Sequence, residues 1–338
     1  MKCLTIASFI FIGITSLFAS ELYVEGSSIG ILDNLEYTHG AGKSGTFFGT
    51  MNGVVLRYNL NSKNSIRGGL FYLHEFGSDI SSEVVRPLIS YRYSSERRMF
   101  LFGSVIRSDL IAPYPIFLLS DKFSHKKPLF EGFFLKRKFS IVDISVWADW
   151  IGLQSPSVHE EFLLGTDINL HIRKFLLKIN YLYNHIASRT ALHDPVKDES
   201  GLNVLTSFSW KRLWILDSLS LSAELLATAV RDRKITMEYD TPLGIKAGTK
   251  IVFNKFSIGY FHYQGVIEGD NGWHNLSKGD MVYKNRSFDQ VDLSVIPVKN
   301  RFVEMFFDLS LISVGGGIDH RENFNLKVPI KSRIGKWE

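Results

Sequence analysis

Apolar and polar residues alternate along most of the chain. Between residues 162 and 172 the even positions are mainly apolar and the odd positions mainly polar, which is the period of a β-strand with one apolar and one polar face. After residues 173–174 the apolar set moves to the odd positions. A two-residue hairpin requires this change, because residues paired across its strands point to the same side of the sheet. The pattern therefore predicts a hairpin in which Ile168 lies beside Ile179 and Asn169 beside Lys178.

The same alternation recurs in other segments, which are joined by short and long connections in turn. The alternating segments are 54–60, 85–93, 141–150, 202–210, 219–227, 288–295, 301–311 and 323–330. The short joins are 61–64, 94–97, 173–174, 254–255 and 299–300, and the long ones are 106–127, 187–200, 230–243 and 265–287. Short turns on one rim and long loops on the other are typical of outer-membrane barrels. The sequence therefore predicts an all-β fold, a transmembrane, antiparallel, up-and-down β-barrel of about 16 strands, with about 14 as the alternative. Its first strand is expected near 21–31, and its last strand is expected to end at residue 330.

The aromatic residues support a membrane barrel over a soluble fold. They make up 13% of the chain, and rings at both edges of an apolar band are expected where strands meet the lipid interfaces. Outward-facing rings are expected near the loop rim at Trp150, Tyr181 and Tyr183, and near the turn rim at Tyr91, Tyr93, Phe175 and Trp210. The rival is a soluble β-sandwich or β-solenoid. The lack of a regular repeat and the bulk of the apolar side chains disfavour it.

The first 20 residues predict an export signal. "MKCLTIASFIFIGITSLFAS" joins one lysine, an apolar run and small residues before a cleavage site after Ala19 or Ser20. The mature barrel is then expected to span residues 21–338. The one cysteine, Cys3, lies inside the signal, so the mature chain is expected to form no disulfide and no thiolate metal site. It also has no apolar run of about 18 residues, and no transmembrane helix is expected.

The polar faces of the predicted strands would line the lumen. The candidate pore-lining residues are Arg86, Arg92, Asp143, Asp149, Glu161, Asp167, His171, Lys178, Asp292 and Glu304. Both signs of charge are present in similar numbers, without the ring of one sign that strong ion selectivity needs. The net charge of +5 comes from 39 basic and 34 acidic residues spread along the chain, which gives nucleic-acid binding no support. A passive or weakly selective pore is therefore the predicted function.

The loop at residues 268–285 contains the loop candidates Asp270, Trp273 and Asp280. Its Asp and Gly residues lack the ladder of oxygen ligands and the closing Glu of a calcium loop. No metal and no cofactor are therefore expected. The loop is interpreted as a constriction that folds into the lumen or as a surface loop. For Trp273 we expect packing within the loop rather than stacking on a sugar.

Enzymatic activity has weaker support in the sequence. No G-x-S-x-G stretch presents a nucleophile, and the His-Glu-Glu at 159–161 lacks a second His at helical spacing. His193, Asp194 and Ser200 lie on a hydrophilic loop, where such residues are common. His185 is expected to face outward at the loop rim, beside Phe162. An outer-membrane hydrolase thus stays an alternative, as does a closed barrel whose loops bind a ligand or a partner.

A family resemblance follows from several short motifs. "IGILDNLEYTHG", "GGLFYLHEFG", "YPIFLLSDKF", "VWADWIGLQSPSVHEEFLLG" and "GDNGWHNLSKGDMVYKNRSFDQVDL" occur in this order. With them the chain resembles an uncharacterised, porin-like family of Gram-negative outer-membrane β-barrels. The resemblance implies a barrel in the outer membrane without an established activity. Such barrels usually end on their last strand, whereas "KSRIGKWE" follows Ile330, so either the last strand is misplaced or the assembly signal is internal.

The resulting hypothesis is a porin-like channel of the bacterial outer membrane for small hydrophilic solutes. Outer-membrane lipid is expected to surround the barrel. A homo-oligomer and an outer-membrane lipoprotein partner stay open.

Overall fold

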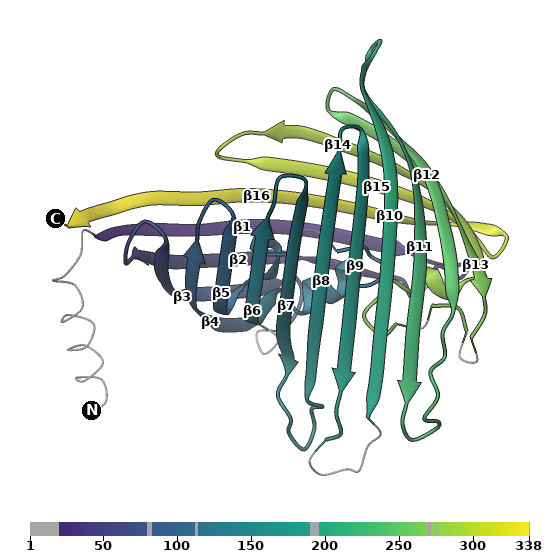
Figure 1. Ribbon diagram of the computed structural model, residues 1–338, viewed down its shortest axis with the longest axis horizontal. Coiled ribbons are helices and arrows are strands. Elements are labelled where there is room, and N and C mark those ends of the chain that lie inside the picture. The colour runs from purple at the N-terminus through teal and green to yellow at the C-terminus, as the bar shows by residue number, and fades with distance from the viewer. Residues whose placement is uncertain are drawn as a thin grey trace.

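The computed structural model describes residues 20–337 except 80–82, 112–113, 190–195, 270–271 and 275. Within these residues, 16 antiparallel strands follow one another around a closed barrel, and the last strand pairs with the first (Figure 1). The predicted fold class and strand number are therefore confirmed. Closure pairs the backbone N–H and C=O groups of every strand, which a bilayer core requires because it offers no water.

The strands differ in length, and β10, β11 and β16 are among the longest. In chain order they are β1 (Ser20–Glu36), β2 (Gly45–Asn59), β3 (Asn64–Glu75), β4 (Val84–Ser94), β5 (Arg98–Ile106), β6 (Leu129–Lys138), β7 (Val142–Gly152), β8 (Glu161–Ile172), β9 (Phe175–Ile186), β10 (Lys197–Leu213), β11 (Leu216–Asp232), β12 (Leu243–Phe253), β13 (Phe256–Ile267), β14 (Ser287–Lys299), β15 (Glu304–Val314) and β16 (Gly317–Trp337). Residues 1–19 of the predicted signal peptide lie outside the described residues.

The β8–β9 hairpin has the register that the alternation predicts. Ile168 pairs with Ile179 and Asn169 pairs with Lys178, so each face of the hairpin is chemically uniform. The turn contains Arg173 with a φ of 54°, a left-handed conformation that two-residue hairpin turns need. Register is fixed here because a slip of one residue would turn every apolar side chain toward the lumen.

The two rims of the barrel differ as predicted. The connections that follow the even-numbered strands are short, and together with both chain ends they form what we call the short-turn rim (Figure 1). The connections that follow the odd-numbered strands form the long-loop rim. Its last connection is an exception, a two-residue turn at Gly315 and Gly316, whose φ values of 60° and 85° suit glycine.

The predicted bounds of the first and last strands were wrong. β1 continues to Glu36, and β16 begins at Gly317 and continues past Ile330 to Trp337. The two strands pair from Glu36 and His320 to Ser20 and Trp337, with one register shift. The tail is thus the last part of the last strand, and it includes an aromatic residue. At the ends of both strands the apolar alternation stops before the backbone pairing does. The alternation therefore underestimates the length of β1 and β16.

The outer wall carries an apolar band. Large exposed apolar side chains occur on strands all around the barrel, including Val54, Leu70, Ile89, Phe102, Leu164, Leu221, Ile245, Ile258 and Phe307. A soluble monomer rarely exposes so extended an apolar surface, whereas a membrane barrel presents one to lipid. Among the described residues, no helix is long and apolar enough to span a membrane.

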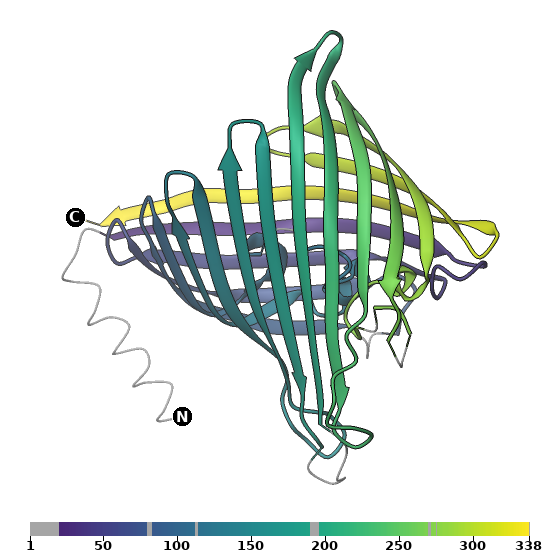
Figure 2. The same ribbon diagram turned by 45° about the vertical axis from the view of Figure 1, so that its right-hand side comes forward.

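The lumen is partly filled by two connections that fold inward. The β5–β6 segment (residues 107–128) contains the 3-10 helix η2 (Arg107–Asp109) and the helix α2 (Asp121–Lys126), and the β13–β14 segment (residues 268–286) contains η3 (Met281–Lys284). Figure 2 shows these coils within the ring of strands. The prediction that the first of them is an outer loop was therefore wrong, and the second folds into the lumen, as one of the two interpretations of this loop expected.

Candidate functional site

A buried arginine ties α2 to the barrel wall. Arg321 on β16 donates from Nε and Nη2 to the two carboxylate oxygens of Asp33 on β1, at 2.7 and 2.8 Å. Its Nη1 donates to Asp121 at 2.7 Å, at the first position of α2. The preceding residue, Ser120, caps the helix by accepting a hydrogen bond from the N–H of Phe123. The start of α2 is thereby fixed beside β1 and β16.

The other end of the β5–β6 segment is fixed to the opposite wall. Arg107 forms an ion pair with Asp149 on β7 at 2.5 Å, and both side chains are almost fully buried. Arg107 also donates to the carbonyl oxygens of Lys127 at 3.0 Å and Leu129 at 2.8 Å. Because charge-assisted bonds of this kind are strong, the segment spans the lumen as a held strap and not as a free loop.

The β13–β14 segment is anchored by a second set of polar contacts. Glu199 on β10 accepts hydrogen bonds from the N–H and the hydroxyl of Ser277, at 3.0 and 2.6 Å. Lys278 forms an ion pair with Glu161 on β8 at 2.7 Å, and its carbonyl oxygen accepts from the N–H of Ser120 at 2.8 Å. The two inward segments therefore support each other.

An apolar layer closes much of the lumen between these anchors. Phe117, Leu118 and Tyr283 from the two segments are at most 2% exposed, as is Trp147 from the inner face of β7. His274 belongs to the same layer, with its ring 4.9 Å from that of Phe117. Burial lowers the pKa of His274 to about 4, so the imidazole is neutral at pH 7.

Five cavities lie beside this layer in the described residues, and three of them form a series past α2. The outer cavity, of about 360 Å³, and the middle cavity, of about 580 Å³, meet at α2, where Lys122 lines the first and His125 the second. The inner cavity, of about 260 Å³, shares the lining residues Ile106 and Lys327 with the middle one. The middle and inner cavities follow the wall formed by β1 and β16, and the outer cavity lies on the other side of α2.

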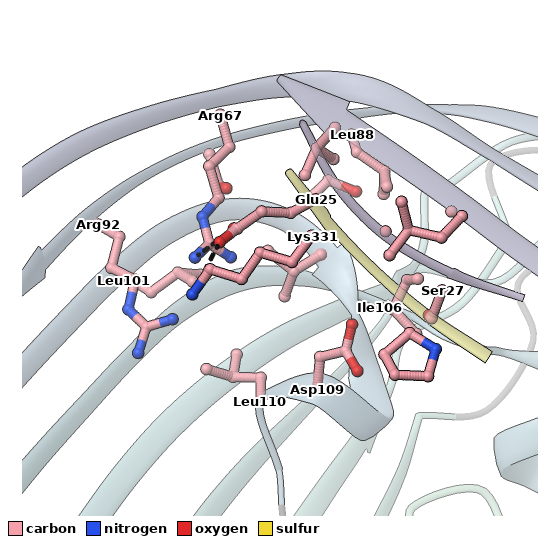
Figure 3. A pocket seen from close by; sticks show the side chains of 18 of the residues that line it. Glu25, Ser27, Arg67, Leu88, Arg92, Leu101, Ile106, Asp109, Leu110 and Lys331 are labelled. Atoms are coloured by element: carbon pink, nitrogen blue, oxygen red, sulfur yellow. Dashed lines mark ion pairs between the residues drawn. The ribbon is translucent and has the colours of Figure 1, made fainter. Parts of the chain in front are cut away.

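The inner cavity is basic. Its lining includes Arg67, Arg92, Lys327 and Lys331, with Glu25 as one of two carboxylates. Figure 3 shows Arg67 and Lys331 on either side of the Glu25 carboxylate, with the Arg92 guanidinium nearby. These residues lie on β1, β3, β4 and β16, toward their ends at the short-turn rim.

The ten candidate pore-lining residues lie at inner-face positions of their strands. Arg86, for example, pairs with Phe71, which is fully buried inside. Six of the ten line cavities, namely Arg92, Glu161, Asp167, Lys178, Asp292 and Glu304. Asp149 forms an ion pair with Arg107, and Asp167 accepts hydrogen bonds from Asn180 and Ser145. Asp143 pairs with Lys136, and His171 is exposed near the short-turn rim.

The loop candidates do not form one site. Trp273 is 8% exposed and packs against Gly265, and Asp280 caps η3 by accepting from the N–H of Val282 at 3.0 Å. Asp270 lies outside the described residues. No group of three or more His, Cys, Asp or Glu side chains that could hold a metal occurs in the described part of the chain.

Several lumen residues were missed by the sequence reasoning. Arg57 and Arg67 pair across β2 and β3 near their turn, at inner-face positions of the two strands. The alternation of apolar and polar residues could have identified both. Arg321 and Lys331 were missed because both fall outside the predicted strand 323–330. Arg107 was missed because its segment was interpreted as an outer loop.

A second polar cluster lies on the outer wall near the long-loop rim. His185 on β9 pairs with Phe162, as expected, and its Nδ1 lies 2.9 Å from a carboxylate oxygen of Asp198 on β10. Asp198 also accepts from Arg231 at 2.6 Å and from Arg233 at 2.9 Å. The cluster thus joins a histidine–carboxylate pair to two guanidinium groups where the wall meets the outer lipid interface.

Comparison with known protein families identifies the family of this chain. A family described as lipid A 3′-O-deacylase-type matches residues 14–312. The chain belongs to this family. Among curated proteins, none matches the chain.

Solved structures similar to this family member are outer-membrane barrels. They include a loop L8 deletion mutant of OmpT from Vibrio cholerae, with a TM-score of 0.58, 11% identity and coverage of 93% of this chain and 100% of that one. The anion-selective porin from Comamonas acidovorans has a TM-score of 0.54 at 10% identity, with 92% and 100% covered. OccK8 (OprE) of Pseudomonas aeruginosa has a TM-score of 0.54 at 8% identity, with 92% and 98% covered. The chain is an outer-membrane β-barrel protein with a porin-like fold.

Proposed function

We propose that the protein is a constricted, porin-like channel for small hydrophilic solutes. The observation that carries the proposal is the series of cavities on both sides of α2, of which the middle and the inner one share lining residues along β1 and β16 and lead toward the short-turn rim. A barrel of 16 strands is wide enough for an aqueous lumen. The two inward segments reduce that lumen to a lateral path.

The lining of the path supports passage of polar solutes. The middle cavity is bordered by Arg107, Asp121, His125, Asp308 and Lys327, among apolar residues. The helix α2 stands between the outer and the middle cavity, and Asp121 is still partly exposed while it binds Arg321. Charged and polar groups at a constriction select solutes by size and charge, so α2 is the proposed constriction.

The experiment is solute flux into liposomes that contain the folded protein, with sugars of increasing size. We expect monosaccharides to enter and larger oligosaccharides to be excluded. The variant Ser104→Trp, which fills the lining of the inner cavity, should reduce flux. Phe102→Trp is the matched control on the same strand, because Phe102 faces the lipid and is 61% exposed. Equal flux for both variants, or no flux through folded wild-type protein, would contradict the channel.

A second candidate function is hydrolysis of a lipid ester on the outer wall. Family membership favours it, and so does the pairing of His185 with Asp198 near the outer lipid interface. A neutral imidazole oriented by a carboxylate can take a proton from water, so that hydroxide attacks the ester carbonyl. Arg231 and Arg233 supply charge for a lipid phosphate. However, the hydroxyl of the neighbouring Ser200 donates to the carbonyl oxygen of Ala229 and not to His185.

Mass spectrometry of lipid A incubated with the protein in mixed micelles distinguishes this function. A hydrolase would release one acyl chain from lipid A, and His185→Asn would abolish this release. His171→Asn is the control, because His171 is exposed on the inner face beside the β8–β9 turn, and this variant would keep the activity. Intact lipid A after incubation with folded protein would exclude the second candidate.

A further inference from the structure

We infer that the inner cavity binds the phosphate group of a small phosphate monoester. This inference rests on the proposed channel function for the route by which the solute arrives, and it names the solute class. The site consists of the basic residues of β3, β4 and β16 that line the cavity with Glu25 (Figure 3).

Glu25 is one carboxylate shared by three cations. Arg57 lies 2.9 Å from it, Arg67 3.3 Å and Lys331 3.9 Å. Its side chain is 17% exposed, and the two arginine side chains are 19% and 18% exposed. One carboxylate cannot neutralise three such groups, so positive charge is left over on this wall of the cavity.

The rest of the lining increases this excess. Arg92 makes no ion pair within 4 Å among the described residues, and Lys327 forms its ion pair with Asp109 at 3.1 Å. Counted over the cavity lining, four cationic side chains face two carboxylates, so the formal charge is +2. A dianion would bring the lining to neutrality.

Unpaired donors indicate where the dianion sits. The Nε–H groups of Arg67 and Arg92, which line the cavity, are buried and have no hydrogen-bond partner, and the same holds for Arg57, which pairs with Glu25. Buried donors are rarely left unpaired, because each forfeits the hydrogen bonds that it makes with water. Two of them in the lining of one cavity, with a third on the arginine that shares Glu25, therefore point to an acceptor with several oxygens.

A phosphate monoester has the required chemistry. It carries a charge of about −1.5 to −2 at pH 7 and has three strong acceptor oxygens, and guanidinium groups bind such oxygens in a planar fork. The cavity of about 260 Å³ lies below the usual range of about 300–1,000 Å³ for drug-sized ligands, so the ligand is small. The side chains Leu88, Leu101 and Leu110 (Figure 3) supply an apolar border for its organic part.

Isothermal titration calorimetry with the full chain, folded in detergent, tests this site. The probes are glucose 6-phosphate, inorganic phosphate, succinate and glucose. We expect glucose 6-phosphate and inorganic phosphate to bind to one site, succinate to bind more weakly, and glucose not to bind. Arg92→Gln should weaken phosphate binding about tenfold. Arg286→Gln, the same substitution at an exposed position on the opposite rim, should leave it unchanged.

A second variant separates binding from a structural role. Glu25→Gln removes the carboxylate that competes with the ligand, so it should tighten phosphate binding. The inference is overturned if wild-type protein binds no phosphate, if Arg92→Gln and Arg286→Gln bind equally well, if succinate binds as tightly as phosphate, or if Glu25→Gln weakens binding. Because calorimetry needs no transport, a protein that binds phosphate but does not conduct would overturn only the channel, and one that conducts without binding would overturn only the phosphate site.

Discussion

Replacing Arg321 by Gln is expected to lower the free energy of unfolding by about 3–5 kcal/mol, the usual cost of breaking a buried ion pair from one side. Asp33 would be left with a 2% exposed carboxylate and without its bidentate partner. The nearby His125 is a poor replacement, because burial is the main effect on its imidazole and lowers the pKa. The measurement is the urea midpoint of the protein refolded in lipid vesicles, followed by tryptophan fluorescence.

A matched control lies on the same strand. Arg333 forms an ion pair with Glu21 at 3.1 Å, but its side chain is 47% exposed. Exposed pairs contribute about 0–1 kcal/mol, so Arg333→Gln should shift the midpoint little. If both substitutions had equally small effects, α2 would not be fixed in the way that the contacts of Arg321 indicate.

Replacing Ile168 by Arg is expected to destabilise the barrel by about 2–4 kcal/mol, the cost of a charge on the lipid face near the midplane. Ile168 pairs with Ile144 on one side and Ile179 on the other, in the apolar outer face. Asn169→Arg is the matched control, because Asn169 lines a lumen cavity together with Lys178. Its cost should be small. Comparable losses at both positions, measured as urea midpoints in vesicles, would contradict the assignment of outer and inner faces.

The wall of the barrel could be predicted from the sequence because lipid and lumen impose opposite chemistry on successive residues. In the β8–β9 hairpin this constraint is strong enough to fix the register, since a slip would expose Asp167 to lipid. The bounds of β1 and β16 could not be predicted in the same way. Around Lys331 and Arg333 polar residues take both parities, while backbone pairing continues to Trp337.

The filling of the lumen could be predicted only in part. For the β13–β14 segment a constriction was one interpretation, but the β5–β6 segment was expected outside the barrel. The β5–β6 segment contains the apolar run Phe117–Leu118–Leu119, which is buried in the apolar layer. Such a run is unusual in a surface loop and could have indicated that this segment folds inward. The basic inner cavity joins β1 and β16 to β2, β3 and β4, and such a juxtaposition depends on closure of the barrel. The residue list from the sequence therefore contained Arg92 but not its neighbours.

Single-channel conductance of the folded protein in a planar bilayer under a salt gradient tests the channel most directly. Wild-type protein is expected to give small, stable steps with a preference for anions, because the inner cavity is basic. Arg321→Gln should give larger steps, because Asp121 at the start of α2 loses its bond to the barrel wall. Silence from both proteins, each shown to be folded and inserted, would contradict a channel through this lumen.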